Sequence, residues 1–225
     1  MSVTKHPVTV LVVYYSRFGV VQALAEAVGA GAREVPGTQV ELLEVDERPL
    51  DERRPGESDG APARRLADTV GRLAAADAII VGSPAYFGSM ASSLKRLFED
   101  CAVEGNPPVH DRSRPWYGHL FRDKVGAAFT ASATPHGGNE MTVHSMLTLM
   151  MHLGMIVVTP GQQEPILERG AAPYGATAIA GPDGDEPPSE DERAEARALG
   201  ERVALLARWL SDGRIAWEKH RVVPA

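Results

Sequence analysis

A short segment near the amino end carries residue types that suit phosphate binding. The run Val8-Thr9-Val10-Leu11-Val12-Val13-Tyr14 is nearly all apolar and predicts a buried strand, and apolar residues then recur at helical spacing from Val21 to Val28. The turn between them holds Ser16 and Gly19 but no acidic residue. Because the first N–H groups of a helix lack partners within it, they favour an anion, most often a phosphate. A plain strand-to-helix connection, eased by Gly19, is the alternative.

Two later loops follow predicted strands and could meet this turn. Residues 76–81 and 124–130 predict strands, and Gly82-Ser83-Pro84 is expected to end the first of them. The loop that follows, residues 82–89, places Tyr86 and Phe87 among glycines, which suits a flat ligand; alternatively Phe87 is a core residue and Tyr86 a surface one. The other loop, residues 130–139, is rich in hydroxyls and glycines. It could donate hydrogen bonds to a ring or sugar, or be a flexible surface turn.

Strands and helices are expected to alternate five times along the chain. Further strands are predicted at 38–45 and 154–159, and helical spacing recurs at 66–73, 90–101 and 140–153. The central strands are apolar without alternation, which is typical of a parallel sheet covered on both faces, an α/β fold. In such sheets ligands bind beyond the carboxyl ends of the strands, where the winding reverses. The loops after the first, third and fourth strands are therefore the candidate site.

The remaining segments fit a single domain, residues 1–225, with its core at about 8–210. Residues 102–123 are interpreted as an insertion, 160–188 as a long loop and 211–225 as a polar tail. Ser189-Glu190-Asp191-Glu192 is a capping box that begins the last helix. We expect the charged run from Asp183 to Glu195 to be solvated, and the following apolar positions to face inward: Leu199, Val203, Leu206 and Leu210.

Composition excludes several classes of protein. The net charge of −7 argues against a general nucleic-acid surface, and no apolar run approaches the ~20 residues of a membrane helix. The single cysteine, Cys101, excludes an intrachain disulfide and is expected to be a packed core thiol. No apolar run precedes a cleavage site, so we expect a cytoplasmic protein. His136, His144 and His152 recur every eight residues, about 80° apart on a helix, and do not predict a metal site.

The choice of cofactor follows from which glycine motifs are missing. A dinucleotide turn needs G-x-G-x-x-G after the first strand, where this chain has only Gly19, and no G-x-x-x-x-G-K-S/T run occurs. A hydroxyl-bearing turn with one glycine fits a mononucleotide phosphate, as in FMN sites of flavodoxin-like sheets.

Several motifs resemble those of the WrbA-type NAD(P)H:quinone oxidoreductases, in the same order and with similar spacing from about Val8 to Leu210. The matching pieces are Tyr14-Tyr15-Ser16, Gly82-Ser83-Pro84 through Phe87-Gly88, His152-x-Gly154-Met155, and Pro173-Tyr174-Gly175-Ala176-Thr177 with Ile179-Ala180-Gly181. The resemblance implies a flavodoxin-like doubly wound sheet of five parallel strands in the order 2-1-3-4-5. It also implies noncovalently bound FMN and a homotetramer whose flavin sites border subunit contacts.

The resemblance also assigns residues. It implies an FMN phosphate loop of Ser16, Arg17, Phe18, Gly19, Val20 and Val21. Beside the isoalloxazine it places Ala85, Tyr86 and Phe87 on one side, and on the other Ser132, Ala133, Thr134, His136, Gly137 and Gly138. His152 matches a flavin-contacting histidine and is the candidate catalytic residue, with a structural histidine at a helix end as the alternative. Phe18 and Trp116 match an aromatic pair associated with nicotinamide and substrate. The family usually has Asn or His at Val20 and often Arg at Tyr86.

Together these features predict an FMN-dependent oxidoreductase. NAD(P)H would reduce the flavin and a quinone would then accept the electrons in the same space, giving two-electron ping-pong kinetics. One alternative is an electron carrier of the same fold that exchanges electrons with protein partners. The other is a flavin-free regulatory protein, since a fold does not determine a function.

Overall fold

A computed structural model describes residues 7–104, 120–162 and 172–221. The strands are β1 (Val8–Tyr14), β2 (Thr38–Glu44), β3 (Ala78–Pro84), β4 (Val125–Ser132), β5 (Ile156–Val157) and β6 (Ala176–Ile179). The helices are α1 (Val20–Glu34), α2 (Ala61–Ala75), α3 (Ser92–Glu104), α4 (Asn139–His152) and α5 (Glu190–Arg221). Strand and helix alternate as expected, and α3 continues three residues into the segment interpreted as an insertion.

All strand pairs are parallel, in the predicted order β2-β1-β3-β4-β5, and β6 also pairs with β4. The prediction of one last strand at 154–159 is wrong, because two short strands share the far side of β4. β5 pairs with Val125 and Gly126, whereas β6 pairs with Phe129–Ser132. The segment 160–188 therefore contains a strand. Four residues among glycines and prolines are too few for a period-2 pattern to identify that strand.

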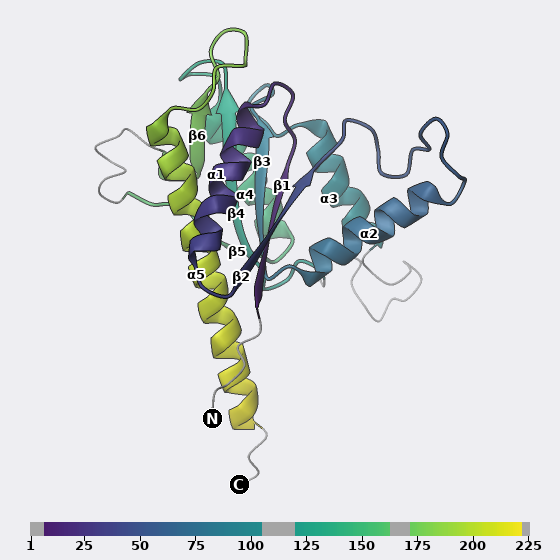
Figure 1. Cartoon of the computed structure of the whole chain (residues 1–225), viewed down its shortest axis with the longest axis vertical. Helices are drawn as coiled ribbons and strands as arrows, with labels where there is room; N and C mark the ends of the chain where they lie inside the picture. Colours follow the sequence, from purple (N-terminus) through teal and green to yellow (C-terminus); the bar gives the residue numbers. More distant parts are fainter. Residues whose placement is uncertain (1–6, 105–119, 163–171, 222–225) are drawn as a thin grey trace.

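Helices cover both faces of the sheet, as Figure 1 shows. Side chains on one face of the strands, such as Val10 and Val12, pack with α1 and α5, and those on the other, such as Leu11 and Val13, pack with α2, α3 and α4. Helices α1 and α5 lie side by side and approach closely, since a Cβ at Gly200 would overlap the α1 backbone. This contact fixes α1, and with it the turn that precedes the helix.

Strand β3 does not end at Gly82-Ser83-Pro84 but runs through these residues to Pro84. Gly82 belongs in the strand because a Cβ there would overlap the ring of Phe129 on β4. The Ser83 hydroxyl oxygen accepts a hydrogen bond of 2.8 Å from the Ala91 amide, and Pro84 is the last residue of the strand, where a missing N–H is tolerated. The composition that predicted a break is thus accommodated by packing.

The final helix is longer than predicted. Residues 211–221 are helical, so the expectation of a tail there is wrong, and the last turns of α5 extend past the sheet (Figure 1). No proline occurs between Pro188 and Pro224 to stop the helix. Leu199 and Val203 are buried as expected, but the expectation for Leu210 is wrong: it is 44% exposed, and its neighbour Ser211 is buried instead. Within the described residues no helix is long and apolar enough to cross a membrane.

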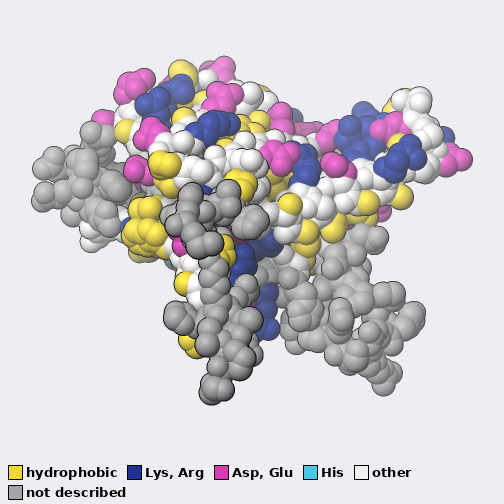
Figure 2. Space-filling view, turned by 60° about the horizontal axis from the view of Figure 1, so that its bottom comes forward, with side chains coloured by type: hydrophobic (Ala, Val, Ile, Leu, Met, Phe, Trp, Pro, Cys, Tyr) yellow, Lys and Arg dark blue, Asp and Glu magenta, His cyan; other side chains and the backbone are white. Residues whose placement is uncertain are grey.

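The described surface is charged with both signs. On the face in Figure 2, Lys and Arg side chains alternate with Asp and Glu side chains. Cys101 is fully buried in the core beneath α3, as predicted from its apolar helical register.

Candidate functional site

The loops after β1, β3 and β4 meet at the carboxyl edge of the sheet. They enclose a hollow of about 150 Å³, which we call the carboxyl-edge pocket. Its lining consists of Ser16, Arg17, Phe18, Val20, Val21, Pro84, Ala85, Tyr86, Ala131, Ser132, Ala133, Ala180 and Gly184. Three segments far apart in the sequence are thus brought together where the strand order reverses.

The turn before α1 presents backbone donors to this pocket. Gly19 has a left-handed backbone, φ 91°, which turns the chain into the helix. The Ser16 hydroxyl oxygen accepts hydrogen bonds from the amides of Gly19 at 3.2 Å and Gln22 at 3.1 Å, and its own hydrogen remains a possible donor. Within the described chain, the amides of Phe18, Val20 and Val21 have no hydrogen-bond partner. Since no described lining residue is acidic, these donors suit an anion.

The aromatic side chains of Phe18 and Tyr86 line the carboxyl-edge pocket, whereas Phe87, the next residue along the chain, does not. Phe87 is fully exposed and has φ 54°, an uncommon backbone for a bulky residue, so the alternative that Phe87 is a core residue is wrong. Tyr86 is half-buried, with its ring edge-on to Tyr15 at 6.4 Å between centroids. Phe18 is 58% exposed, and the Arg17 guanidinium lies 5.7 Å from its ring centroid. These rings offer flat apolar surfaces beside the turn that precedes α1.

The loop after β4 is divided between two hollows. Ser132 and Ala133 line the carboxyl-edge pocket. His136 and Gly138 instead line a larger hollow on the other side of the loop, which we call the β6 cavity: it lies between residues 135–141, Thr177 and Ile179 of β6, and residues 189–195. Thr134 and Gly137 stabilise the loop itself, since the Gly137 amide donates to the Thr134 carbonyl at 2.9 Å. The predicted set therefore does not share one surface.

His152 is not brought to the pocket. It is the last residue of α4, which begins at the carboxyl edge with Asn139 and runs to the opposite edge. There the Asp123 amide, just before β4, donates to the Gly154 carbonyl at 3.0 Å. His152 is exposed at that edge, so it cannot reach a flavin bound in the pocket of its own chain. Trp116 lies outside the described residues.

A third hollow, of about 500 Å³, lies on the β2 side of the turn and shares Ser16 and Arg17 with the pocket. The Tyr15 hydroxyl donates to the Glu47 carboxylate here. Burial first, and then this hydrogen bond, raise the pKa of Tyr15 above its ordinary value. Tyr15 therefore stays protonated at neutral pH and connects the turn to the loop after β2.

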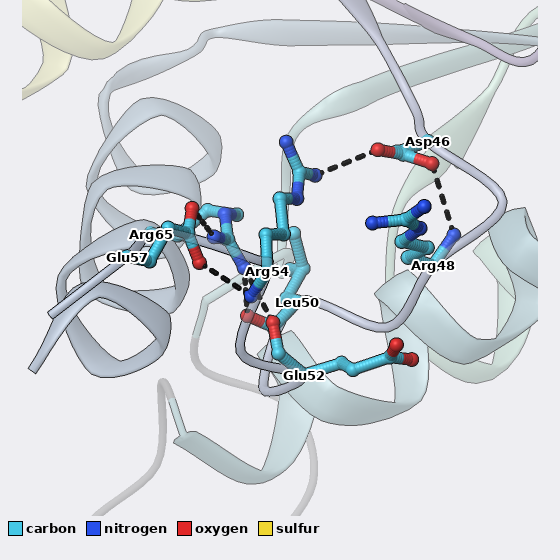
Figure 3. A network of polar contacts seen from close by, with 7 residues as sticks. All are labelled: Asp46, Arg48, Leu50, Glu52, Arg54, Glu57 and Arg65. Atoms are coloured by element: carbon cyan, nitrogen blue, oxygen red, sulfur yellow. Dashed lines mark hydrogen bonds and ion pairs between the residues drawn. The ribbon is translucent and has the colours of Figure 1, made fainter. Parts of the chain in front are cut away.

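Ion pairs hold the loop after β2 in place, although its sequence has no periodicity (Figure 3). Arg54 pairs with Asp46 at 2.8 Å, while Arg65 of α2 pairs with Glu57. Arg65 also donates to two backbone carbonyls, those of Leu50 and Glu52. The wall next to the turn before α1 is thus a polar network of ion pairs and hydrogen bonds.

Four lining residues were not among the contacts assigned from the sequence, although Pro84 and Ala131 lie in the predicted candidate loops. Pro84, Ala131, Ala180 and Gly184 line the carboxyl-edge pocket but have no reactive group that would single them out. Ala180 directly follows β6, so an early assignment of that strand would have placed it at the carboxyl edge. Their small side chains leave the space that the pocket occupies.

Comparison with known proteins identifies the family. The family model described as NADPH-dependent FMN reductase matches residues 8–163. This chain belongs to the NADPH-dependent FMN reductase family. Among curated relatives of this FMN reductase family member, "NAD(P)H dehydrogenase (quinone)" of Chromohalobacter salexigens is 40% identical over 88% of this chain and 96% of its own length. A protein of the same name from Trichlorobacter lovleyi is 39% identical over 87% and 95%.

Solved structures similar to this FMN reductase family member support the fold. A flavodoxin, WrbA-like protein from Agrobacterium tumefaciens superposes with a TM-score of 0.61 at 24% identity, covering 90% of this chain and 98% of that one. A flavodoxin from the domain Archaea gives a TM-score of 0.55 at 20% identity, covering 89% and 99%. The flavodoxin-like fold is therefore confirmed.

The residues present fit part of an FMN molecule. The unpartnered amides and the Ser16 hydroxyl suit its phosphate, and the exposed rings of Phe18 and Phe87 suit a flat ring system. A pocket of about 150 Å³ is smaller than the ~300–1,000 Å³ of typical ligand sites. It would enclose the phosphate end, and the rest of the nucleotide would lie along the open rim.

Proposed function

We propose that this chain is an FMN-dependent oxidoreductase that transfers electrons from NAD(P)H through the flavin to a quinone. The observation that carries the proposal is the set of unpartnered amides at Phe18, Val20 and Val21 in a pocket without acidic lining residues. The names of the relatives support the electron donor and the acceptor. When bound, FMN supplies the redox chemistry, and the protein supplies binding, orientation and exclusion of water.

In this proposal each part of the site has a separate task. The amino end of α1 binds the phosphate, and Arg17 adds a positive charge beside it. The rings of Tyr86 and Phe87 border the isoalloxazine, and Phe18 contacts the nicotinamide or the quinone. Because the rim is a single open surface, the two co-substrates occupy it in turn, which gives two-electron ping-pong kinetics. No described side chain of the pocket needs to act as a nucleophile.

We also propose a homotetramer in the cytoplasm. His152 is exposed at the amino edge of the sheet, so it can contact only a flavin of another copy. An exposed apolar side chain next to His152 on the same helix, Met151 at 59%, supports a subunit contact there. The cytoplasmic location is supported by the cysteine content, because a chain with a single cysteine cannot form the intrachain disulfides typical of secreted proteins.

Anaerobic spectroscopy tests the function. Protein loaded with FMN is mixed with NADH or NADPH, and a quinone is then added. We expect the visible flavin band to bleach rapidly with one or both nucleotides and to return with one quinone per flavin. Reduction by dithionite but not by either nucleotide would support the electron carrier instead. Protein that takes up no FMN would support the flavin-free regulatory protein.

A further inference from the structure

One apolar face runs along helix α5 and continues past the body of the protein. It is formed by residues that are alternately four and three positions apart: Leu199, Val203, Leu206, Leu210, Gly213 and Trp217. Leu199 and Val203 are fully buried in the core, whereas Leu210 is 44% and Trp217 66% exposed. The same face is therefore covered near the beginning of the helix and uncovered where the helix extends past the sheet (Figure 1).

The spacing of this face indicates what kind of element covers it. Apolar or small residues that recur every 3.5 positions on average form the seam along which one helix packs against another. Trp209, which is 59% exposed, and Ala216, also exposed, lie beside this face and widen it. We call the exposed part, residues 206–217, the α5 seam. Contiguous exposed apolar side chains mark interaction sites, and the pattern favours a second helix as the partner.

The charged side chains of the α5 seam already have partners in their own chain. Arg208 pairs with Asp212 at 3.9 Å. Arg214 pairs with Asp77, at the amino edge of the sheet, also at 3.9 Å. A helix that binds an anionic lipid surface usually presents unpaired basic side chains beside its apolar face. Because both arginines of the seam have acidic partners, an apolar protein surface fits the seam better than a lipid surface.

We propose that the α5 seam binds the α5 seam of a second copy of this chain, with the two helices antiparallel and related by a two-fold axis. Leu206 of each copy then faces Trp217 of the other, and Leu210 faces Gly213. This contact lies on a different helix from the one proposed around His152. It does not depend on the redox function.

Two observations favour the antiparallel arrangement. A Cβ at Gly213 would meet no atom within 4 Å, so the space beside this glycine is open to the larger side chain of Leu210 from the other copy. A parallel pair would instead place Gly213 opposite Gly213 and leave that space unfilled. A parallel pair would also bring two chains of net charge −7 side by side, whereas antiparallel helices keep the two bodies at opposite ends.

A carboxylate in the α5 seam should separate the two copies. Leu210→Glu and Trp217→Glu each place a charge where the pairing excludes water, so association should weaken about tenfold or more. Sedimentation equilibrium of the full-length protein should then give the wild type twice the mass of either variant. Ala198→Glu adds the same charge at an exposed position of α5 outside the seam and should associate like the wild type. Equal masses for the wild type and both seam variants would overturn the proposal, and unchanged circular dichroism shows that each variant is folded.

Cysteine cross-linking tests the direction of pairing. Leu206→Cys and Trp217→Cys are prepared separately, mixed in equal amounts and oxidised with diamide. Positions 206 and 217 lie ~16 Å apart along a helix, too far for a disulfide, so an antiparallel pair can join only unlike variants. We expect a covalent dimer in the mixture and none in either variant alone, and the buried Cys101 should give no background. A covalent dimer in either variant alone, or none in the mixture, would overturn the proposal.

Vesicles test the alternative occupant, a lipid surface. The full-length wild type and Leu210→Glu are centrifuged with phosphatidylglycerol vesicles at physiological salt. We expect neither protein to sediment with the vesicles, because the seam is covered by the second copy. Sedimentation of the wild type with the vesicles that is lost in Leu210→Glu would show that lipid covers the seam, and would overturn the proposal.

Discussion

The carboxyl-edge pocket and the β6 cavity share a loop, yet their chemistry is opposite. The pocket is small, has no acidic residue in its described lining and faces unpartnered backbone donors. The cavity is larger, and its described lining includes the carboxylates of Glu140, Asp191, Glu192 and Glu195 but no lysine or arginine. One side of residues 132–138 therefore suits a phosphate, and the other repels it. Proximity in a fold does not make two hollows one site, because the charges and hydrogen-bond donors of each lining determine which ligand it attracts.

The largest loss of free energy is expected from a substitution in β3, below the carboxyl-edge pocket. In Gly82→Ala the new methyl group would overlap the Phe129 ring between β3 and β4. We expect a loss of about 3 kcal/mol in the free energy of unfolding, measured with urea. Gly71→Ala on α2 is the control, since a Cβ there meets no atom within 4 Å and should stabilise the helix by up to ~1 kcal/mol. Equal unfolding midpoints for Gly82→Ala and wild type would contradict the close contact between Gly82 and the Phe129 ring.

A negative charge placed at position 16, in the turn before α1, should make the carboxyl-edge pocket repel phosphate. Aspartate at position 16 can still accept from the amides of Gly19 and Gln22, so Ser16→Asp should fold normally. Its carboxylate would repel the phosphate, and we expect FMN to bind about a hundredfold more weakly by fluorescence titration. Ser16→Asn is the neutral control and should lose far less affinity. Similar losses in both variants would mean that charge is not what the pocket selects.

The buried carboxyl group of the cavity should appear in the pH dependence of stability. Glu195 has an ordinary pKa of 4.5 and a folded-state pKa of about 8, so between these values the unfolded chain has lost a proton that the folded chain keeps. Unfolding is thus favoured as pH rises through this range, by up to ~1.4 kcal/mol per pH unit. Glu195→Gln should remove this slope from thermal unfolding measured at pH 5 to 8, whereas Glu201→Gln should keep it. If stability depends on pH as strongly in Glu195→Gln as in the wild type, the burial of the Glu195 carboxyl group is not its cause.

The smallest change is expected when the exposed ring of Phe18 is removed. Phe18→Ala removes an exposed ring without touching the amides, so KM for the quinone or the nucleotide should rise about fivefold while FMN affinity is unchanged. Trp209→Ala on α5, an aromatic side chain with similar exposure, is the control. Steady-state constants identical in Phe18→Ala and wild type would remove Phe18 from the substrate site.

Much of the fold follows from hydrophobic pattern alone. The apolar runs of β1 and β4 and the helical spacing of α1 and α4 predicted the parallel sheet and the edge where three loops meet. Local composition failed where tertiary packing decides. Gly82 stays in a strand because of the Phe129 ring, and β6 is too short to have a pattern of its own.

The site was less predictable than the fold, for a geometric reason. Sequence spacing could not show that α4 carries His152 to the opposite edge, or that His136 faces away from Ser132. Glu195 was included in a solvated charged run, and that prediction is wrong. A signal was available, because Glu195 precedes Leu199 and Val203 by four and eight residues and so shares their buried face.

The central claim is that backbone amides at the start of α1 hold the phosphate of FMN. Titrating flavin-free protein with FMN and with riboflavin, which lacks only the phosphate, tests it most directly. The amides of Phe18, Val20 and Val21 should make FMN bind tighter than riboflavin by about a thousandfold or more, because hydrogen bonds to a charged group contribute about 1.5–3 kcal/mol each. Equal affinities for the two flavins would contradict the account.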